Sequence, residues 1–235
     1  MIYVGIDDTD TLDDPGTNQL ARHLVRELAS QFRGQMILRH QLLEDPRVPC
    51  TKKNGCASIA FEPSNSIPMT EFIATLRHLI VPWCPPGSDP GLCVAEEVPQ
   101  AVVEWGLRCQ REFVKQSDAR QIAAENKIYL EGLGGTEGGV IGALAAIGLM
   151  ATQNDGRVIH FESDGADWYD LTGCLDVNEI RQHGVNEILI MNTGEPLTAG
   201  IVNIGKRLRP NYREGKIVLY VAQNEALDWE AVRVL

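Results

Sequence analysis

Three carboxylates stand close together near the start of the chain, at Asp7, Asp8 and Asp10. They follow the apolar and β-branched run 2–6, which predicts a buried strand that ends in a functional loop. Mg²⁺ takes oxygen ligands and usually binds through one or two carboxylates together with substrate phosphates. A solvated acidic turn, with one aspartate capping the next helix, explains the same residues without a metal. The placement after an apolar strand favours the metal site.

A second group of residues suited to chemistry is the glycine-rich segment 132–139. Gly135, Thr136, Gly138 and Gly139 would let backbone N–H groups approach a phosphate closely, and the start of the following helix would add positive partial charge. The segment is not a Walker A sequence, because no Lys-Ser/Thr pair follows its last glycine. Tight packing of the next helix explains the glycines equally well.

A third candidate is Lys52, the first residue of a Lys-Lys-Asn-Gly stretch, which could neutralise a phosphate. A solvated hairpin turn is the alternative for this stretch. The five histidines contain no pair with metal-ligand spacing. The six cysteines form no Cys-x-x-Cys, and a chain of this size needs no disulfides, so we expect reduced thiols.

The elements that must position these residues can be predicted from apolar spacing. After the strand at 2–6, a helix begins at Thr17 with Thr17 or Asn18 as its N-cap. Segment 81–91 is rich in proline and reads as an irregular loop or linker. Further helices are predicted at 72–80, 99–114, 117–126, 140–150 and 177–183, and further strands at 36–43, 56–61, 158–161, 187–191, 201–204 and 217–221.

The composition limits the classes of function. The chain has 235 residues, 44% of them hydrophobic, which is enough for one large or two small domains. It has no apolar stretch long enough to cross a bilayer and no secretory signal at its start, so we expect a cytoplasmic protein without membrane contact. The net charge of −11 argues against bulk binding to nucleic acid. One basic footprint remains, at Lys206, Arg207, Arg209, Arg213 and Lys216.

Several of these motifs resemble those of one family, the archaeal tRNA(Ile) 2-agmatinylcytidine synthetases. The resemblance rests on Gly-Ile-Asp-Asp-Thr-Asp at 5–10, Thr17, Lys52 before Gly55, Ser-Asp-Pro-Gly at 88–91, and Gly-Val-Ile-Gly-Ala-Leu-Ala-Ala-Ile-Gly at 139–148. It implies an α+β (mixed α/β) fold with two domains. A kinase-like α/β domain without a P-loop would cover residues 1–150, packed with a ferredoxin-like α+β domain over residues 151–235.

The resemblance also implies a function. ATP and Mg²⁺ would be the cofactors of a ligase or phosphoryl-transfer enzyme, with a nucleobase or small molecule as acceptor and a small amine as a further substrate. Asp7, Asp8 and Asp10 would lie by the metal and the triphosphate, and Thr17 matches a threonine implicated in phosphorylation. Asp89 and the glycine loop would help to bind the nucleotide.

Two departures from the family keep a second hypothesis open. The arginine of the family's glycine loop is replaced by Gly138, and Glu137 adds a negative charge beside it. The chain is also expected to lack the family's OB and zinc-ribbon domains, so that tRNA would be bound weakly or through a partner protein. The alternative to an enzyme is therefore a nucleotide-responsive binding or regulatory protein that has kept the fold and lost catalysis.

Overall fold

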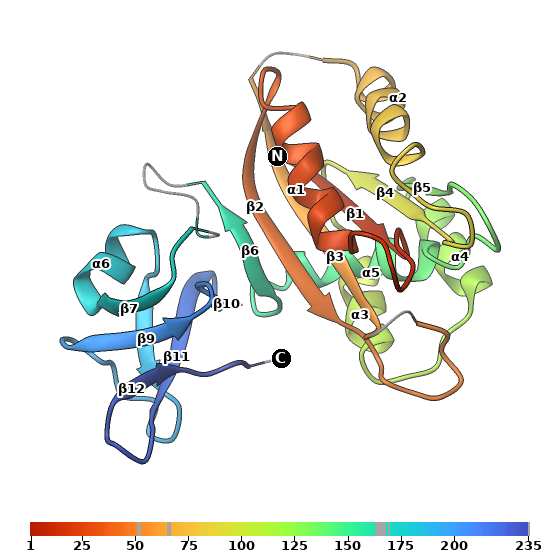
Figure 1. Cartoon of the computed structure of the whole chain (residues 1–235). Helices are drawn as coiled ribbons and strands as arrows, with labels where there is room; N and C mark the ends of the chain where they lie inside the picture. The colour runs from red at the N-terminus through yellow and green to blue at the C-terminus, as the bar shows by residue number, and fades with distance from the viewer. Residues whose placement is uncertain (51–52, 65–66, 163–167, 169, 235) are drawn as a thin grey trace. The chain divides into compact units, whose positions relative to one another are not determined.

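The computed structural model describes residues 1–50, 53–64, 67–162, 168 and 170–234. The chain divides into two compact units, Met1–Thr152 and Gln153–Leu235 (Figure 1). Strands and helices occur in both units, so the predicted mixed α+β fold is confirmed. Within the described residues, no helix combines the length and the apolar character needed to cross a membrane.

The described part of the first unit contains an antiparallel sheet in the order β5-β4-β1-β3-β2. The central strand β1 is apolar and mostly buried, as its sequence predicted, and hydrogen-bonds to a neighbour on each side. The bounds are β1 Ile2–Asp7, β2 Phe32–Gln41, β3 Gly55–Pro63, β4 Gly91–Ala95 and β5 Tyr129–Gly132.

The strand directions bring distant parts of the sequence to one edge of this sheet. Asp7, the last residue of β1, pairs with Gly91, the first residue of β4. Gly91 in turn pairs with Gly132, the last residue of β5. Because β1 is antiparallel to β3 as well, Gly55 at the start of β3 lies at the same edge. The acidic loop, which we define as residues 7–16, the segment before Gly91 and the glycine-rich loop therefore emerge side by side.

Helices cover both faces of the sheet (Figure 1). α1 contacts β1, β2 and β3 on one face, and α2 contacts α1. α5 contacts all five strands from the other face, and α3 and α4 pack against α5. The bounds are α1 Thr17–Glu27, α2 Met69–Ile80, α3 Gln100–Cys109, α4 Gln116–Glu125 and α5 Val140–Ala151.

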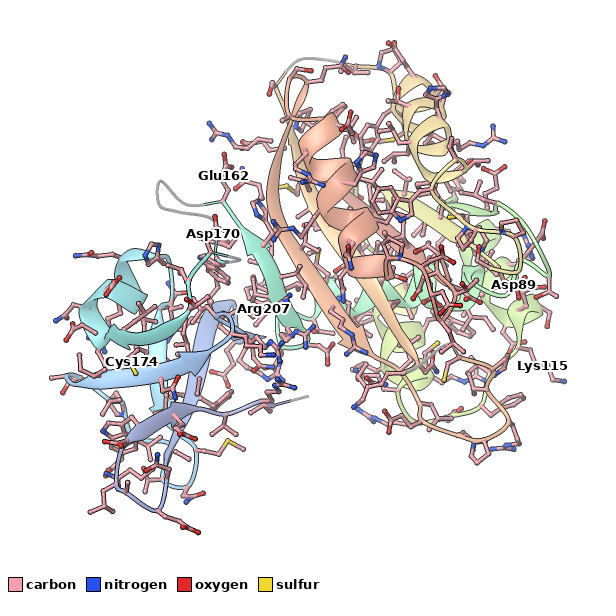
Figure 2. All side chains as sticks on the ribbon, in the orientation of Figure 1. Asp89, Lys115, Glu162, Asp170, Cys174 and Arg207 are labelled. Carbon is pink, nitrogen blue, oxygen red and sulfur yellow. The ribbon has the colours of Figure 1, made fainter. Side chains whose placement is uncertain are left out.

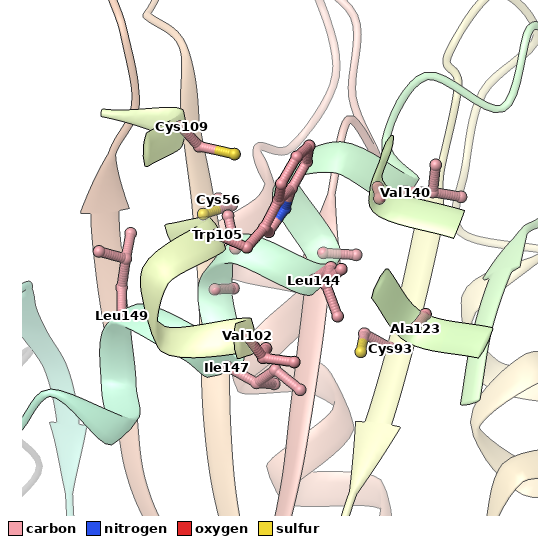
Figure 3. Close-up of a cluster of buried hydrophobic side chains, with 14 of the residues drawn as sticks. Cys56, Cys93, Val102, Trp105, Cys109, Ala123, Val140, Leu144, Ile147 and Leu149 are labelled. Atoms are coloured by element: carbon pink, nitrogen blue, oxygen red, sulfur yellow. The ribbon is translucent and has the colours of Figure 1, made fainter. Parts of the chain in front are cut away.

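The core around α5 combines small and large apolar side chains of the helix, such as Ala143 and Leu144, with side chains from the sheet, α3 and α4 (Figure 3). Trp105 of α3 is buried there, and its indole N–H donates to the carbonyl oxygen of Ile141 at 3.1 Å. Since α5 is apolar on every side, it needs partners on every side, which the sheet and α3 and α4 supply.

Glycines allow α5 to lie with its backbone against its neighbours. A Cβ on Gly5 of β1 would lie 1.9 Å from the carbonyl oxygen of Ala143, and one on Gly148 would lie 2.0 Å from that of Val102. No side chain fits at such distances. Gly148 is therefore required for packing, and α5 is tightly fixed to the sheet that carries the acidic loop.

The described part of the second unit contains strands around the long strand β11. β8 pairs with β11 in parallel and β9 with β12 in parallel, whereas the β6–β10, β10–β11, β11–β12 and β7–β9 pairs are antiparallel. The bounds are β6 Arg157–Phe161, β7 Gly173–Asp176, α6 Val177–Gln182, β8 Glu187–Ile190, β9 Ile201–Gly205, β10 Asn211–Arg213, β11 Lys216–Gln223 and β12 Trp229–Ala231.

The structure corrects parts of the sequence prediction. Strands β4, β5, β7, β10 and β12 were not predicted, because each has five residues or fewer and shows little alternation. The helix predicted at 99–114 ends at Cys109. The predicted N-cap of α1 is also wrong: Gly16 occupies that position without a side-chain hydrogen bond. Thr17 is already the first residue of the helix, and its hydroxyl accepts from Thr9 and donates to Asp10.

Candidate functional site

The acidic loop begins where β1 ends, and its backbone turns sharply. Asp8 has a φ of 53°, in the left-handed region that aspartate and asparagine tolerate better than most residues. The carboxylate of Asp7 lies against α5, where a Cβ on Gly142 would be 2.0 Å from its Oδ2. Gly142 therefore makes room for the Asp7 side chain, and the helix and the acidic loop fit together at this point.

Electrostatics at the acidic loop favour a lower negative charge. Burial is the main reason that the pKa of Asp7 is raised to about 8, and the charges of Asp8 and Asp10 raise it further, against a lowering by Arg39. The pKa of Asp8 is raised to about 6, again mainly by burial and then by Asp89 and Asp10. Negative charge concentrated in this way is relieved either by protons or by a bound cation.

Hydroxyl groups connect the acidic loop to α1. The Thr9 hydroxyl donates to the Thr17 hydroxyl at 3.1 Å, and the Thr17 hydroxyl donates to Asp10 Oδ1 at 3.2 Å. Both threonines are buried. A hydroxyl that donates to a carboxylate is oriented as an activated nucleophile would be. The same contacts also hold the start of α1 against the loop, so the role of Thr17 stays a prediction.

A ready-made metal cage is absent from the part of the chain that the structure describes, where no three His, Cys, Asp or Glu side chains are grouped to hold an ion. A magnesium ion does not require such a cage, because it keeps several waters and shares phosphate oxygens with one or two carboxylates. The donor chemistry of Asp7, Asp8 and Asp10 fits that mode of binding. The metal site therefore remains a prediction, in which phosphate oxygens of a bound nucleotide supply part of the coordination.

Asp89, which is labelled in Figure 2, forms hydrogen bonds with the glycine-rich loop. Its Oδ1 accepts from the Thr136 backbone N–H at 2.5 Å and its Oδ2 from the Thr136 hydroxyl at 2.7 Å. Its carbonyl oxygen accepts from the Gly139 N–H at 2.9 Å. A Cβ on Gly135, whose φ is 57°, would lie 1.8 Å from Oδ1. The carboxylate of Asp89 thus accepts from the backbone N–H and the hydroxyl of Thr136, a residue predicted from the sequence to bind a phosphate.

The other residues of the loop have different roles. Glu137 forms an ion pair with Arg120 of α4, which offsets the negative charge expected to disturb a phosphate. Gly138 has room for a side chain, since the nearest atom to a Cβ there is the Thr136 hydroxyl at 3.5 Å. Gly139 has none, because a Cβ would meet Asp89 O at 2.4 Å and Gly91 N at 2.6 Å. Gly139 is thus required for packing.

The structure brings together every predicted site residue that it describes, because Asp7, Asp8, Asp10, Thr17, Asp89 and the glycine loop lie at one edge of the sheet. Lys52 lies outside the described residues. Its neighbour Lys53 is exposed and pairs with Glu44 at 3.9 Å.

Two further residues lie beside this site: Asn18, which the sequence suggested only as a possible N-cap of α1, and Cys84, which sequence reasoning missed. Asn18 has a buried Oδ1 without a hydrogen-bond partner among the described residues. The pKa of Cys84 is raised to about 11, mainly by burial and then by Asp10 and Asp8, which places this thiol near the acidic loop. Cys84 carries no signal of its own in the sequence, since it lies at this edge only because of how the chain folds.

The sequence is similar to those of known proteins over 63% of the chain. The chain is 30% identical over 159 residues to the tRNA(Ile2) 2-agmatinylcytidine synthetase TiaS of Pyrococcus horikoshii. The resemblance to the TiaS proteins is confirmed. The match covers 63% of the chain and 35% of the relative, so the chain spans about a third of that TiaS protein. The chain is also 29% identical over 157 residues to an uncharacterized protein of Methanocaldococcus jannaschii, covering 49% of it. No family model matches the chain.

Solved structures agree with this resemblance at the level of the fold. A TiaS–tRNA(Ile2)–ATP complex aligns with a TM-score of 0.54 and 21% identity, over 63% of this chain and 36% of that one. A TiaS–tRNA(Ile2)–AMPCPP–agmatine complex aligns with the same score and identity over 62% of this chain. The first is a complex with ATP and tRNA, and the second contains an ATP analogue and agmatine. These ligands are bound by TiaS in its own structures.

Proposed function

We propose that this chain is an ATP- and Mg²⁺-dependent enzyme of the ligase or phosphoryl-transfer type, and that the acidic loop is its active site. The observation that carries the proposal is the meeting of Asp7, Asp8 and Asp10 with Asp89 and the glycine-rich loop at one edge of the sheet. The likeness to TiaS, whose solved complexes contain ATP or its analogue, supports the same reading.

In this proposal Asp7, Asp8 and Asp10 hold the magnesium ion, which neutralises phosphate charge when it is bound. Asp10 orients the Thr17 hydroxyl through the hydrogen bond between them, and Asn18 Oδ1 offers an unused acceptor at the same end of α1. Gly138 leaves space beside the loop for a phosphate. Lys52 would add positive charge from the segment before β3. Positioning and charge neutralisation supply most of the catalysis in such reactions.

We further propose that the acceptor is a nucleobase or a small molecule and that a small amine is the second substrate. The support is the agmatine and tRNA held by the TiaS complexes. RNA would then be bound weakly by this chain or through a partner, because its net charge is −11.

A thermal-shift experiment tests the proposal. ATP with Mg²⁺ should raise the melting temperature, whereas ATP with EDTA or Mg²⁺ alone should raise it much less. Release of phosphate or pyrophosphate from ATP is then measured with agmatine and other small amines, with and without RNA. Absence of any shift with Mg·ATP at millimolar concentration would contradict the proposal.

One observation favours the second candidate, a nucleotide-responsive binding protein without catalysis. Asp89 already accepts from the Thr136 N–H and hydroxyl. Two donors of the glycine-rich loop are therefore bonded to a carboxylate of the chain itself and not to a phosphate. A protein of this kind would bind the nucleotide and show a thermal shift, but it would release no phosphate or pyrophosphate with any acceptor. The two readouts of the preceding experiment therefore separate the two candidates.

A further inference from the structure

A pocket in the second unit is lined by an unusual number of basic side chains. Its volume is about 170 Å³, and it lies where β9 and β12 end. Residues 153–235 carry eight Lys and Arg against 13 Asp and Glu, yet half of these cations line this pocket. The four are Lys206, Arg207, Arg209 and Arg233. Figure 2 labels Arg207, and Glu230 is the acidic residue of the described lining.

The loop that follows β9 is held in place by its own residues. The Gly205 N–H donates to Asn203 Oδ1 at 2.9 Å, and Gly205 turns the chain with a φ of 69°. Leu208 is buried, and the Pro210 carbonyl oxygen accepts from the Val158 N–H at 2.8 Å. The loop is therefore anchored on both sides of the two arginines at 207 and 209.

The segment that follows β12 is held in the same way. The Val232 N–H donates to the Tyr220 carbonyl oxygen at 2.8 Å. The side-chain amide of Asn211, which is buried, donates to the Val234 carbonyl oxygen at 3.1 Å. These two contacts bracket Arg233. Because β9 and β12 are parallel, their carboxyl ends lie together, and both segments reach the pocket from the same end of the strands.

Two other cations of the basic footprint predicted from the sequence lie outside the pocket. The Arg213 guanidinium donates to its neighbour's carbonyl oxygen, Tyr212 O, at 2.7 Å. Lys216 forms an ion pair with Glu187 at 2.5 Å. The basic residues therefore do not form a continuous stripe, which is the pattern typical of a surface that follows a polynucleotide backbone. They gather in one small pocket, which suits a compact anion.

We propose that this pocket binds a phosphate group of a small molecule, either inorganic phosphate or the terminal phosphate of a phosphomonoester. Such a group carries about 1.5 to 2 negative charges at neutral pH and several acceptor oxygens, which match the planar donors of arginine. A volume of about 170 Å³ admits a phosphate with a water molecule or a short substituent. The inference rests on the second unit alone and is independent of the proposed function.

Calorimetric titration tests the proposal on the whole chain in EDTA, which keeps magnesium away from the acidic loop. The probes are inorganic phosphate, glycerol 3-phosphate and a 12-nucleotide single-stranded RNA. Arg209→Gln and Arg233→Gln should each weaken phosphate or phosphomonoester binding about tenfold or more, since each removes charge-assisted hydrogen bonds. Lys216→Gln removes one positive charge outside the pocket and should change the affinity less than twofold.

The outcomes separate the sources of the phosphate. Tighter binding of glycerol 3-phosphate than of inorganic phosphate supports an organic phosphomonoester, and the reverse order supports the free ion. Equal losses in all three variants would show bulk charge only and overturn the proposal. RNA that binds more tightly than both small probes, with the same loss on Arg233→Gln, would overturn it in favour of a polynucleotide.

A second measurement does not depend on the variants. In amide NMR spectra of the unmodified chain, phosphate should shift the resonances of Gly205 and Val232 by more than those of residues away from the pocket. The absence of any shift at millimolar phosphate would contradict the proposal even if an arginine variant failed to fold.

Discussion

Asp8 combines an unusual backbone conformation with a charge that the fold disfavours. Asparagine tolerates a φ of 53° as well as aspartate does, so Asp8→Asn removes the charge without straining the backbone. We expect the metal-free variant to melt at the same temperature as the parent chain or higher, because the repulsion with Asp89 and Asp10 is reduced. We also expect it to lose the stabilisation by Mg·ATP.

Asp13→Asn is the matched control for this prediction, since Asp13 is an exposed acid of the same loop. Asp13→Asn should leave the melting temperature unchanged, both without metal and in the presence of Mg·ATP. Stabilisation of Asp8→Asn by Mg·ATP equal to that of the parent chain would mean that Asp8 does not hold the metal.

The raised pKa of Asp7 predicts how stability depends on pH. The folded chain keeps a proton on Asp7 up to a pKa of about 8, whereas the unfolded chain loses it near 3.8. The folded state therefore binds more protons between these values, and the free energy of unfolding should fall as the pH rises. The slope contributed by one such group is at most about 1.4 kcal/mol per pH unit. Asp8, with a pKa of about 6, adds to the fall between 3.8 and 6.

Urea denaturation in EDTA between pH 5 and 9 measures this dependence. Asp7→Asn should flatten it, because asparagine does not titrate. A difference between the parent and Asp7→Asn curves that stays constant from pH 5 to 9 would show that Asp7 is already ionised in the folded chain, because neither state would then bind a proton there.

At the scale of the elements, the start of α5 is fixed by backbone contacts. Gly139→Ala should lower the free energy of unfolding by about 1–3 kcal/mol, the usual cost of forcing extra atoms into a packed site, because its Cβ would meet Asp89 O and Gly91 N. Gly138→Ala is the matched control, since a Cβ there makes only ordinary contacts. Chemical denaturation measures both. Similar losses in the two variants would contradict the packing role of Gly139.

Gly138 also allows a gain of function to be tested. Gly138→Arg would place the family's positive charge in the space beside the glycine loop, near Asp89. If phosphates lie there, the variant should bind ATP more tightly than the parent chain.

The elements that the sequence predicted well are those with long or regular apolar patterns. The strand ending at Asp7 and the helix starting at Val140 were predicted nearly to the residue, because one is a continuous apolar run and the other is apolar on every side. Strand β4 was missed because it lies directly after a proline-rich loop, and β5 because it has only four residues. The pairing Asp7–Gly91–Gly132, which assembles the candidate site, depends on these two strands.

The same limit applies to individual site residues. The sequence identified Asp89 as part of a motif but not its contact with Thr136, since 47 residues separate them. Hydrogen bonds over such separations follow from strand register, which short strands specify weakly from sequence alone.

At the scale of the whole molecule, net charge governs contact with nucleic acid. With a net charge of −11, we expect tRNA to bind weakly, with an affinity that falls steeply between 50 and 200 mM salt. Filter binding over this range measures it. Submicromolar affinity at 150 mM salt would show that local basic residues outweigh the overall charge.

The hydrogen bond between Trp105 and Ile141 has a consequence for spectroscopy. Ile141 precedes Gly142, whose backbone lies against the Asp7 carboxylate, so an indole ring in the core is two contacts away from the acidic loop. A ligand that changes the charge on Asp7 changes the field at this ring, and the fluorescence emission of the tryptophan should shift. Trp105→Phe should reduce that response to Mg·ATP, whereas Trp229→Phe, in the second unit, should preserve it. The chain thus contains an intrinsic fluorophore that can report binding at the acidic loop without any label.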